Sequence, residues 1–193
     1  MRYIIPIYGS KTACVILGML KLGRRTGYEI KSLVDVSTRF FWAASYGQIY
    51  PELPRLEEAG LVKGVRDPDD PRRRKAYALT PEGERALHDW LTSGAPLHLE
   101  LRHEGLLKFF FSDHLSTEEK LEQVRRMRAE HERVAAEFRA IEPGARAAAE
   151  ARGEEHPVAT LEFGIAYEEF VVDWCRRLER RFAEPAATGG ARR

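Results

Sequence analysis

The 193-residue sequence has only two cysteines, lacks any long apolar run and carries charges that almost cancel. Cys14 and Cys175 stand far apart within helical patterns, so we expect buried thiols, not a disulfide or a metal-binding pair. No segment approaches the roughly 18 to 20 apolar residues of a membrane span. The short apolar start also lacks the small-residue cleavage site of a secretory signal. These features predict a cytoplasmic protein that has no membrane partner.

Signatures of catalysis and cofactor binding are also missing. The sequence contains no glycine-rich phosphate loop and no Gly-x-Ser-x-Gly elbow. His98, His103 and His114 are separated by five and eleven residues, which matches no common zinc pattern. His131 lies on an apolar stripe, where a packed histidine is expected more often than a ligand. We therefore expect no enzyme activity, no cofactor and no metal.

The distribution of charge says more than the net charge of +1. Residues 1–94 hold 15 Lys and Arg against 11 Asp and Glu, a net +4, whereas the remainder holds 16 against 19, a net −3. A basic first half joined to an acidic second half is typical of a DNA-binding protein with a partner-facing tail.

Residues 45–60 form the most informative stretch. Ser45 and Gln48 frame a Ser-x-x-Gln capping box, which predicts a helix that ends at Gly60. Ile49, Leu53 and Leu56 recur at spacings of four and three and so predict one buried stripe. The polar positions at the start of the helix suit insertion into a DNA major groove, although an ordinary amphipathic surface helix is the alternative. The candidate DNA-reading residues here are Ser45, Tyr46, Gly47, Gln48 and Tyr50.

A predicted β-hairpin follows this helix directly. Residues 61–66 and 76–79 are strand-like, and residues 67–71 carry two prolines and three aspartates typical of a turn. The basic run that comes next is placed to contact DNA phosphates as the wing of a helix-turn-helix. A solvated loop whose charges offset the aspartates is the alternative. The run consists of Arg72, Arg73, Arg74 and Lys75.

Three shorter helices complete the predicted first domain, over residues 10–22, 26–36 and 80–91. Thr26 and Glu29 form a second capping box, and Thr80 precedes a proline at the first helical position. Tyr28 lies in the first turn of its helix. Its hydroxyl could reach a DNA phosphate, and packing against the wing is an equally good interpretation.

Taken together, these segments resemble PadR-type transcriptional regulators. The resemblance covers residues 10 to about 91 and is carried by GYEI at 27–30, GQIYPELPRLEEAGLV at 47–62 and RKAYALTPEG at 74–83. It implies a homodimeric, cytoplasmic, usually repressing regulator whose C-terminal helices dimerise and help respond to an effector. One departure is Pro54, which follows Pro51 within the same helix and predicts a bend or a local 3₁₀ turn.

The second half of the chain is predicted to be helical. Residues 100–112 are apolar on all sides, which favours a sandwiched helix, and a longer helix starts at the capping box of residues 116–119. Pro143, Gly144 and the stretch that follows them to Pro157 predict a bend or a turn before a last helix at 158–182. The expected fold is mainly α. It has a winged helix-turn-helix over residues 1–94 with an arm at 1–9, a helical dimerisation domain over 95–185 and a disordered tail at 186–193.

Two sets of apolar residues in this half are candidates for binding. Near-heptad spacing predicts helix packing between subunits. The dimerisation candidates are Leu121, Val124, Met127, Val134, Phe138, Leu161, Ile165 and Val172. A small aromatic or apolar effector could be bound by Trp42, Phe109, Phe110 and Trp174, although these side chains would serve equally well as the core of the dimer.

The sequence therefore predicts a sequence-specific regulator that binds double-stranded DNA, with a homodimeric repressor on a palindromic operator as the main hypothesis. The alternative is a helical protein-interaction adaptor that uses the winged helix as a docking module. The basic run at 72–75 favours the regulator, because an adaptor has no use for cations beside a polar helix start.

Overall fold

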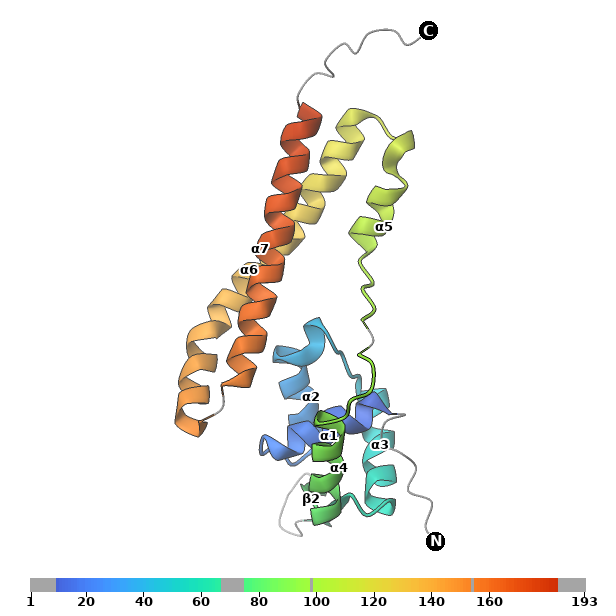
Figure 1. Ribbon diagram of the computed structural model, residues 1–193, viewed down its shortest axis with the longest axis vertical. Coiled ribbons are helices and arrows are strands. Elements are labelled where there is room, and N and C mark those ends of the chain that lie inside the picture. The colour runs from blue at the N-terminus through green and yellow to red at the C-terminus, as the bar shows by residue number, and fades with distance from the viewer. Residues whose placement is uncertain (1–9, 67–74, 98, 154, 184–193) are drawn as a thin grey trace. The chain divides into compact units, whose positions relative to one another are not determined.

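The computed structural model describes residues 10–66, 75–97, 99–153 and 155–183 and divides the chain into two compact units, residues 1–97 and 98–193 (Figure 1). Its helices and a two-stranded antiparallel sheet confirm the predicted mainly α winged-helix class. Within the described ranges, no helix is both long and apolar enough to cross a bilayer. The predicted arm at 1–9 and the predicted tail at 186–193 lie outside the described residues.

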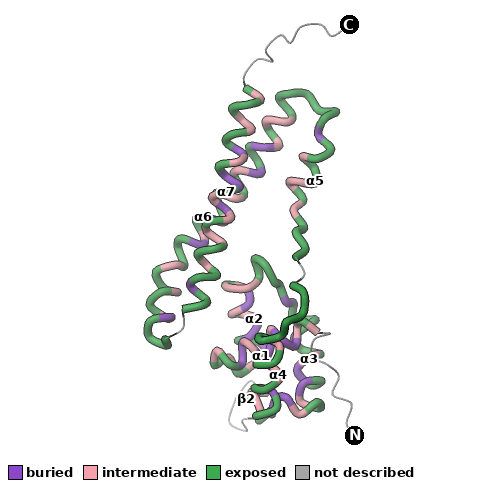
Figure 2. The backbone as a smooth tube through the Cα atoms, in the orientation of Figure 1, coloured by how far each residue is buried: buried purple, intermediate pink, exposed green. Residues whose placement is uncertain are grey.

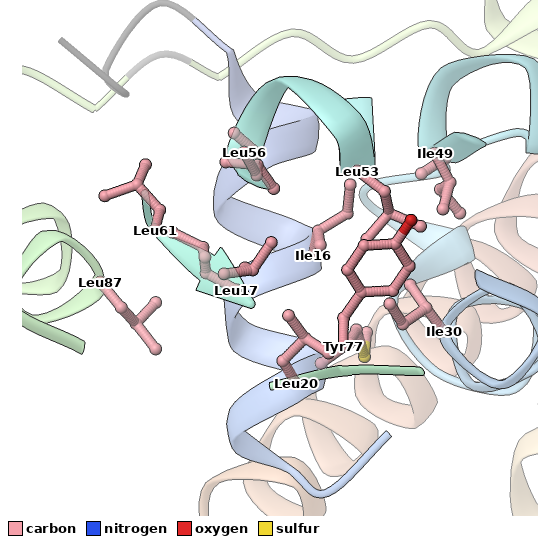
Figure 3. Packing of buried hydrophobic residues seen from close by; sticks show 14 of the residues in the cluster. Ile16, Leu17, Leu20, Ile30, Ile49, Leu53, Leu56, Leu61, Tyr77 and Leu87 are labelled. Carbon is pink, nitrogen blue, oxygen red and sulfur yellow. The ribbon is translucent and has the colours of Figure 1, made fainter. Parts of the chain in front are cut away.

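Three capped helices build the core of the first unit: α1 (Lys11–Lys21), α2 (Gly27–Val36) and α3 (Tyr46–Glu58), with a 3₁₀ turn η2 (Thr38–Phe40) after α2. The Ser10 hydroxyl accepts from the amide of Ala13 at 3.2 Å, and Thr26 and Glu29 cap each other's backbone as predicted. Their apolar stripes meet in one cluster (Figure 3), in which the least exposed side chains are Ile16, Leu17, Ile30, Val34, Ile49 and Leu53.

The wing consists of strands β1 (Val62–Arg66) and β2 (Lys75–Leu79), followed by helix α4 (Pro81–Leu91). Thr80 joins these parts: its hydroxyl donates to the carbonyl of Gly60 at 2.7 Å and accepts from the amide of Gly83 at 3.0 Å. A Cβ on Gly83 would overlap the carbonyl oxygen of Leu61. Glycine is therefore required at position 83, because α4 begins in direct contact with Leu61 at the entry to β1.

The second unit is built on a helical hairpin. Helix α6 (Thr117–Arg152) and helix α7 (His156–Ala183) lie side by side and reverse at Gly153, whose φ of 67° is left-handed (Figure 1). A short helix α5 (Glu104–Phe110) and the 3₁₀ turn η3 (Ser112–His114) precede them, and α5 packs on α6.

Two predictions about this unit differ from the structure. Helix α6 runs without a break through Pro143 and Gly144, and the bend or turn that we expected between residues 143 and 157 comes at Gly153. The run ARAAAEAR that follows is rich in strong helix formers, and its contacts with α7 add to that preference. The apolar helix begins only at Glu104. Leu106 and Phe109 pack against the core of the unit, whereas Leu107 is 60% exposed and Phe110 is 77% exposed among the described residues, so the helix is covered on one side only.

Helix α3 contains no 3₁₀ turn, although such a turn was one of the two outcomes that we expected of Pro54. Helix α3 stays α-helical through Pro51 and Pro54. Both rings lie on the exposed side, so neither clashes with the core, although each proline leaves the carbonyl four residues earlier without its helical donor. Burial of the opposite face against α1 and α2 is enough to hold the helix together.

Half of the predicted dimerisation stripe is internal to the hairpin, which corrects the assignment of those four residues to contacts between subunits. Val124 is 0% exposed, Phe138 3% and Val172 6%, and Met127 is also buried. Figure 2 shows buried stretches along both α6 and α7. Periodicity showed correctly that these side chains face a helix, but that helix belongs to the same chain. The remaining candidates are only half-buried: Leu121, Val134, Leu161 and Ile165.

Candidate nucleic-acid interface

Helix α3 presents three different surfaces around its axis. Its rear carries Ile49, Leu53 and Leu56, which are 0 to 4% exposed, as predicted. At 3.6 residues per turn the outermost line is formed by Gly47, Pro51, Pro54 and Glu58, so its first two turns carry no hydrogen-bonding side chain. The polar side chains of these turns therefore lie on the two flanks of the helix, with Tyr46 and Tyr50 on one flank and Gln48 on the other.

The tyrosine flank is a stacked pair beside the first turn of α2. The rings of Tyr46 and Tyr50 lie 5.8 Å apart between centroids and are 44% and 51% exposed. A Cβ on Gly27 would come within 3.1 Å of the ring of Tyr50, so glycine lets α2 approach this ring closely. Tyr28 follows in the same turn and is 55% exposed. This arrangement places three tyrosines on the exposed surface shared by α2 and α3.

One cation at this surface escaped the sequence analysis. The ammonium of Lys31 lies 5.4 Å from the ring centroid of Tyr46 and is ion-paired with Asp35. The sequence could have placed Lys31 at this surface, because it follows Tyr28 by three residues on a capped helix and residues three apart share a helix face.

Gln48 is held by the residue that caps its own helix. Its Oε1 accepts from the backbone N–H of Ser45 at 2.9 Å and lies 3.2 Å from the Ser45 hydroxyl. The side chain thus takes part in the predicted capping box and is still exposed. Gly47 beside it leaves open space, since a Cβ there would meet only the Ser45 hydroxyl at 3.7 Å.

Lys75 occupies a different position from the one expected of a phosphate ligand. Its ammonium is ion-paired with Glu57 near the end of α3 and lies 5.3 Å from the ring centroid of Tyr77. The other oxygen of Glu57 accepts from the amide of Gly64 at 3.2 Å, and a Cβ on Gly64 would collide with the Lys75 side chain. Lys75 therefore ties the wing to the helix. Arg72, Arg73 and Arg74 lie outside the described residues.

The four candidate effector residues fall in both units. Phe109 and Trp174 pack edge to face at 5.6 Å in the core of the second unit, whereas Phe110 is exposed. Trp42 belongs to the first unit and is 43% exposed. A groove of about 1110 Å³ in the second unit is lined by other residues, including His103, Gly105, Met127 and His131.

A chain of polar contacts crosses the second unit beside this groove. His103 Nε2 lies 2.9 Å from His131 Nε2, and His131 Nδ1 contacts the carboxylate of Glu168, which is only 8% exposed. Burial and the neighbouring His131 lower the pKa of His103. The sequence analysis treated His131 as a packed residue. The sequence alone did not show that His131 contacts Glu168, which lies 37 residues later on α7.

The two units match two different families of known proteins. Residues 16–89 match the transcriptional regulator PadR-like family, and residues 101–183 match the virulence activator alpha C-terminal family. The negative transcriptional regulator PadR of Bacillus subtilis is 36% identical over 105 residues, which is 54% of this chain. That match spans 58% of the relative, less than two thirds of its length.

Solved structures extend the likeness over both units. Bacillus subtilis PadR in complex with operator DNA has a TM-score of 0.80 at 25% identity, covering 88% of this chain and 96% of that one. The Vibrio cholerae virulence activator AphA has a TM-score of 0.67 at 25% identity, covering 89% and 97%. Bacillus subtilis PadR with p-coumaric acid, at 24% identity, shares the fold with a TM-score of 0.75 over 96% and 99%. Residues 16–89 therefore form a domain of the PadR-like family of transcriptional regulators.

Proposed function

We propose that the protein is a homodimeric repressor that binds a palindromic operator in double-stranded DNA. Helix α3 enters the major groove, and the wing follows the phosphates. The observation that carries this proposal is the construction of α3: its rear is locked into the core, while Tyr46, Gln48 and Tyr50 are exposed around its first turns. An amphipathic surface helix without a ligand has no need of exposed, stacked aromatic side chains.

The distribution of charge supports the proposed placement of α3 in the major groove and of the wing along the phosphates. The free amides at the start of α3 favour an anion, and Tyr28, which is 55% exposed, lies at the neighbouring surface. Arg72, Arg73 and Arg74 follow the turn of the wing in the sequence. In this proposal these groups contact phosphates and give affinity without sequence preference, whereas Gln48 and Tyr46 read bases.

Dimerisation is assigned to the outer surface of the α6–α7 hairpin. Phe163 and Phe170 are 68% and 62% exposed and lie two turns apart on α7, so they share one face. Large exposed apolar side chains on one face call for a partner, and the half-buried Leu161 and Ile165 adjoin them in sequence. Two recognition helices related by a two-fold axis would then read half-sites one or two helical turns apart.

We also propose release of the operator by a small aromatic or apolar effector. On the second unit Phe110 offers exposed aromatic surface for such a ligand, although Phe109 and Trp174 already fill space against each other. On the first unit Trp42 is a separate candidate. The ligand would act by binding more tightly to a form of the dimer whose two winged units do not match the operator spacing.

Fluorescence anisotropy on DNA from the region upstream of the protein's own gene tests the proposal. The titration is repeated at several salt concentrations, with a scrambled duplex as the control. We expect binding that saturates at two chains per duplex, weakens steeply with salt and is at least about a hundredfold weaker on scrambled DNA. Equal affinity for both duplexes would refute the regulator function.

A further inference from the structure

The amide of Gln48 has a defined orientation because of what it contacts. The backbone N–H of Ser45 can only donate, so the atom that it meets at 2.9 Å must be the carbonyl oxygen of Gln48 and not its nitrogen. The Ser45 hydroxyl lies on the same oxygen at 3.2 Å. The acceptor of Gln48 is therefore already engaged inside the protein, and its NH₂ group is the half available to a ligand.

We propose that Gln48 is a donor-only reader that selects guanine and rejects cytosine at the base pair it meets in each half-site. This inference rests on the proposed function, since it assumes that α3 enters the major groove of operator DNA. It adds the chemical class of base that the helix recognises.

The pattern of groups in the major groove gives the reason. A free glutamine pairs with adenine through two bonds, donating to N7 and accepting from the N6 amino group. Here the accepting half is occupied by Ser45, so adenine can offer only N7. Guanine presents two acceptors, N7 and O6, to the same NH₂ group, whereas cytosine presents only a donor, its N4 amino group. The ranking is therefore guanine first and cytosine last.

The surroundings of Gln48 favour a base over a phosphate as its target. It lies at the third residue of α3, and the start of a recognition helix approaches base edges in helix-turn-helix complexes. Gly47 beside it provides open space for an approaching base edge. Its contact with Ser45 also fixes the side chain before binding, which reduces the entropy lost on recognition.

Selection from a randomised operator library, read by sequencing, tests the proposal with three proteins. Wild type should enrich guanine over cytosine by about tenfold at one position in each half-site, as expected for one good base contact. Gln48→Ala should lose the preference at that position alone. Gln48→Glu keeps an oxygen for the Ser45 N–H but presents acceptors, so it should shift the preference to cytosine.

Glu119→Ala is the matched control, because it removes the equivalent capping contact from α6 in the second unit. It should leave the selected sequence unchanged, and thermal unfolding of all variants establishes that each is folded. If wild type selects no sequence, the proposed function itself fails. If wild type selects an operator and Gln48→Ala lowers affinity for every sequence equally, Gln48 contacts a phosphate and the donor-only reading is overturned. Selection of adenine at the Gln48-dependent position would likewise overturn it.

Discussion

The histidine chain in the second unit makes a prediction about pH and stability. His103 caps α5, and its Nδ1 accepts from the amide of Leu106 at 3.1 Å. The proton of the neutral ring must then be on Nε2, where it donates to His131 Nε2. His131 in turn carries its proton on Nδ1, facing Glu168. Every hydrogen bond is satisfied only when each ring holds one proton.

Adding a proton to His103 breaks this arrangement, because a proton on its Nδ1 would face the amide of Leu106. The other ionisable groups around the chain are Glu104 and Lys108 on α5, Glu130 on α6, and Tyr167 and Glu168 on α7. Lys108 pairs with Glu104 and Arg133 with Glu130, so these acids already have cationic partners.

The direction in which pH changes folding stability follows from the lowered pKa of His103. Below its ordinary value of 6.5 the unfolded chain takes up a proton that the folded chain resists, so folding stability is full above that pH and falls as the pH drops. One proton gives at most about 1.4 kcal/mol per pH unit. Partial solvent contact lowers this upper limit. The expected loss of folding free energy is about that of one helix cap and one hydrogen bond. We expect about 1 kcal/mol to be lost between pH 8 and pH 5.5.

Urea unfolding at the two pH values measures this loss, with His103→Asn as the test variant. Asparagine caps helices well and does not titrate, so most of the pH-dependent loss should disappear. His88→Asn is the control, because His88 lies on the surface of α4 with a side chain 75% exposed. It should keep the wild-type dependence. An unchanged dependence in His103→Asn, or a wild-type stability that rises as the pH falls, would refute the reasoning.

Four further predictions concern other parts of the chain. Gly83→Ala should lower the free energy of unfolding by about 2 kcal/mol or more in urea titration, because its Cβ would overlap the carbonyl oxygen of Leu61. Phe138→Ala should cost about 3 kcal/mol by the same assay, since a 3% exposed ring leaves a cavity. Cys175 should resist a thiol reagent at pH 8 until the protein unfolds, because burial raises its pKa to about 11. Arg73→Ala combined with Arg74→Ala should weaken binding similarly on all DNA sequences and flatten the salt dependence; an unchanged slope would exclude phosphate contact.

The elements that the sequence predicted well are those set by local chemistry. Caps at Ser10, Thr26 and Thr80 each satisfy an amide within three residues, so the pattern that specifies them is contained in four consecutive letters. Gly60 likewise stops α3 through its own backbone, with a φ of 74°. Such features can be predicted without knowing what the rest of the chain does.

The errors arose where a distant partner decides the outcome. Pro143 would end an isolated helix, yet α6 continues because α7 covers its apolar side over many turns. Periodicity identified Val124 and Phe138 as buried, but a spacing pattern states only that a face is apolar and not which helix covers it. An intrachain hairpin and a coiled coil between subunits therefore have the same sequence signature.

The candidate interface shows the same limit at the scale of single atoms. Sequence identifies Gln48 and Lys75 as donors near DNA, but it does not show which of their hydrogen-bonding groups the protein already uses. Glu57, 18 residues before Lys75, draws that ammonium into the joint between helix and wing. Ser45 engages the Gln48 oxygen and leaves its nitrogen. Base specificity depends on the hydrogen-bonding groups that are not already used inside the protein. The internal contacts of α3 therefore decide which bases the proposed interface can recognise, and a list of its exposed residues is not enough to predict them.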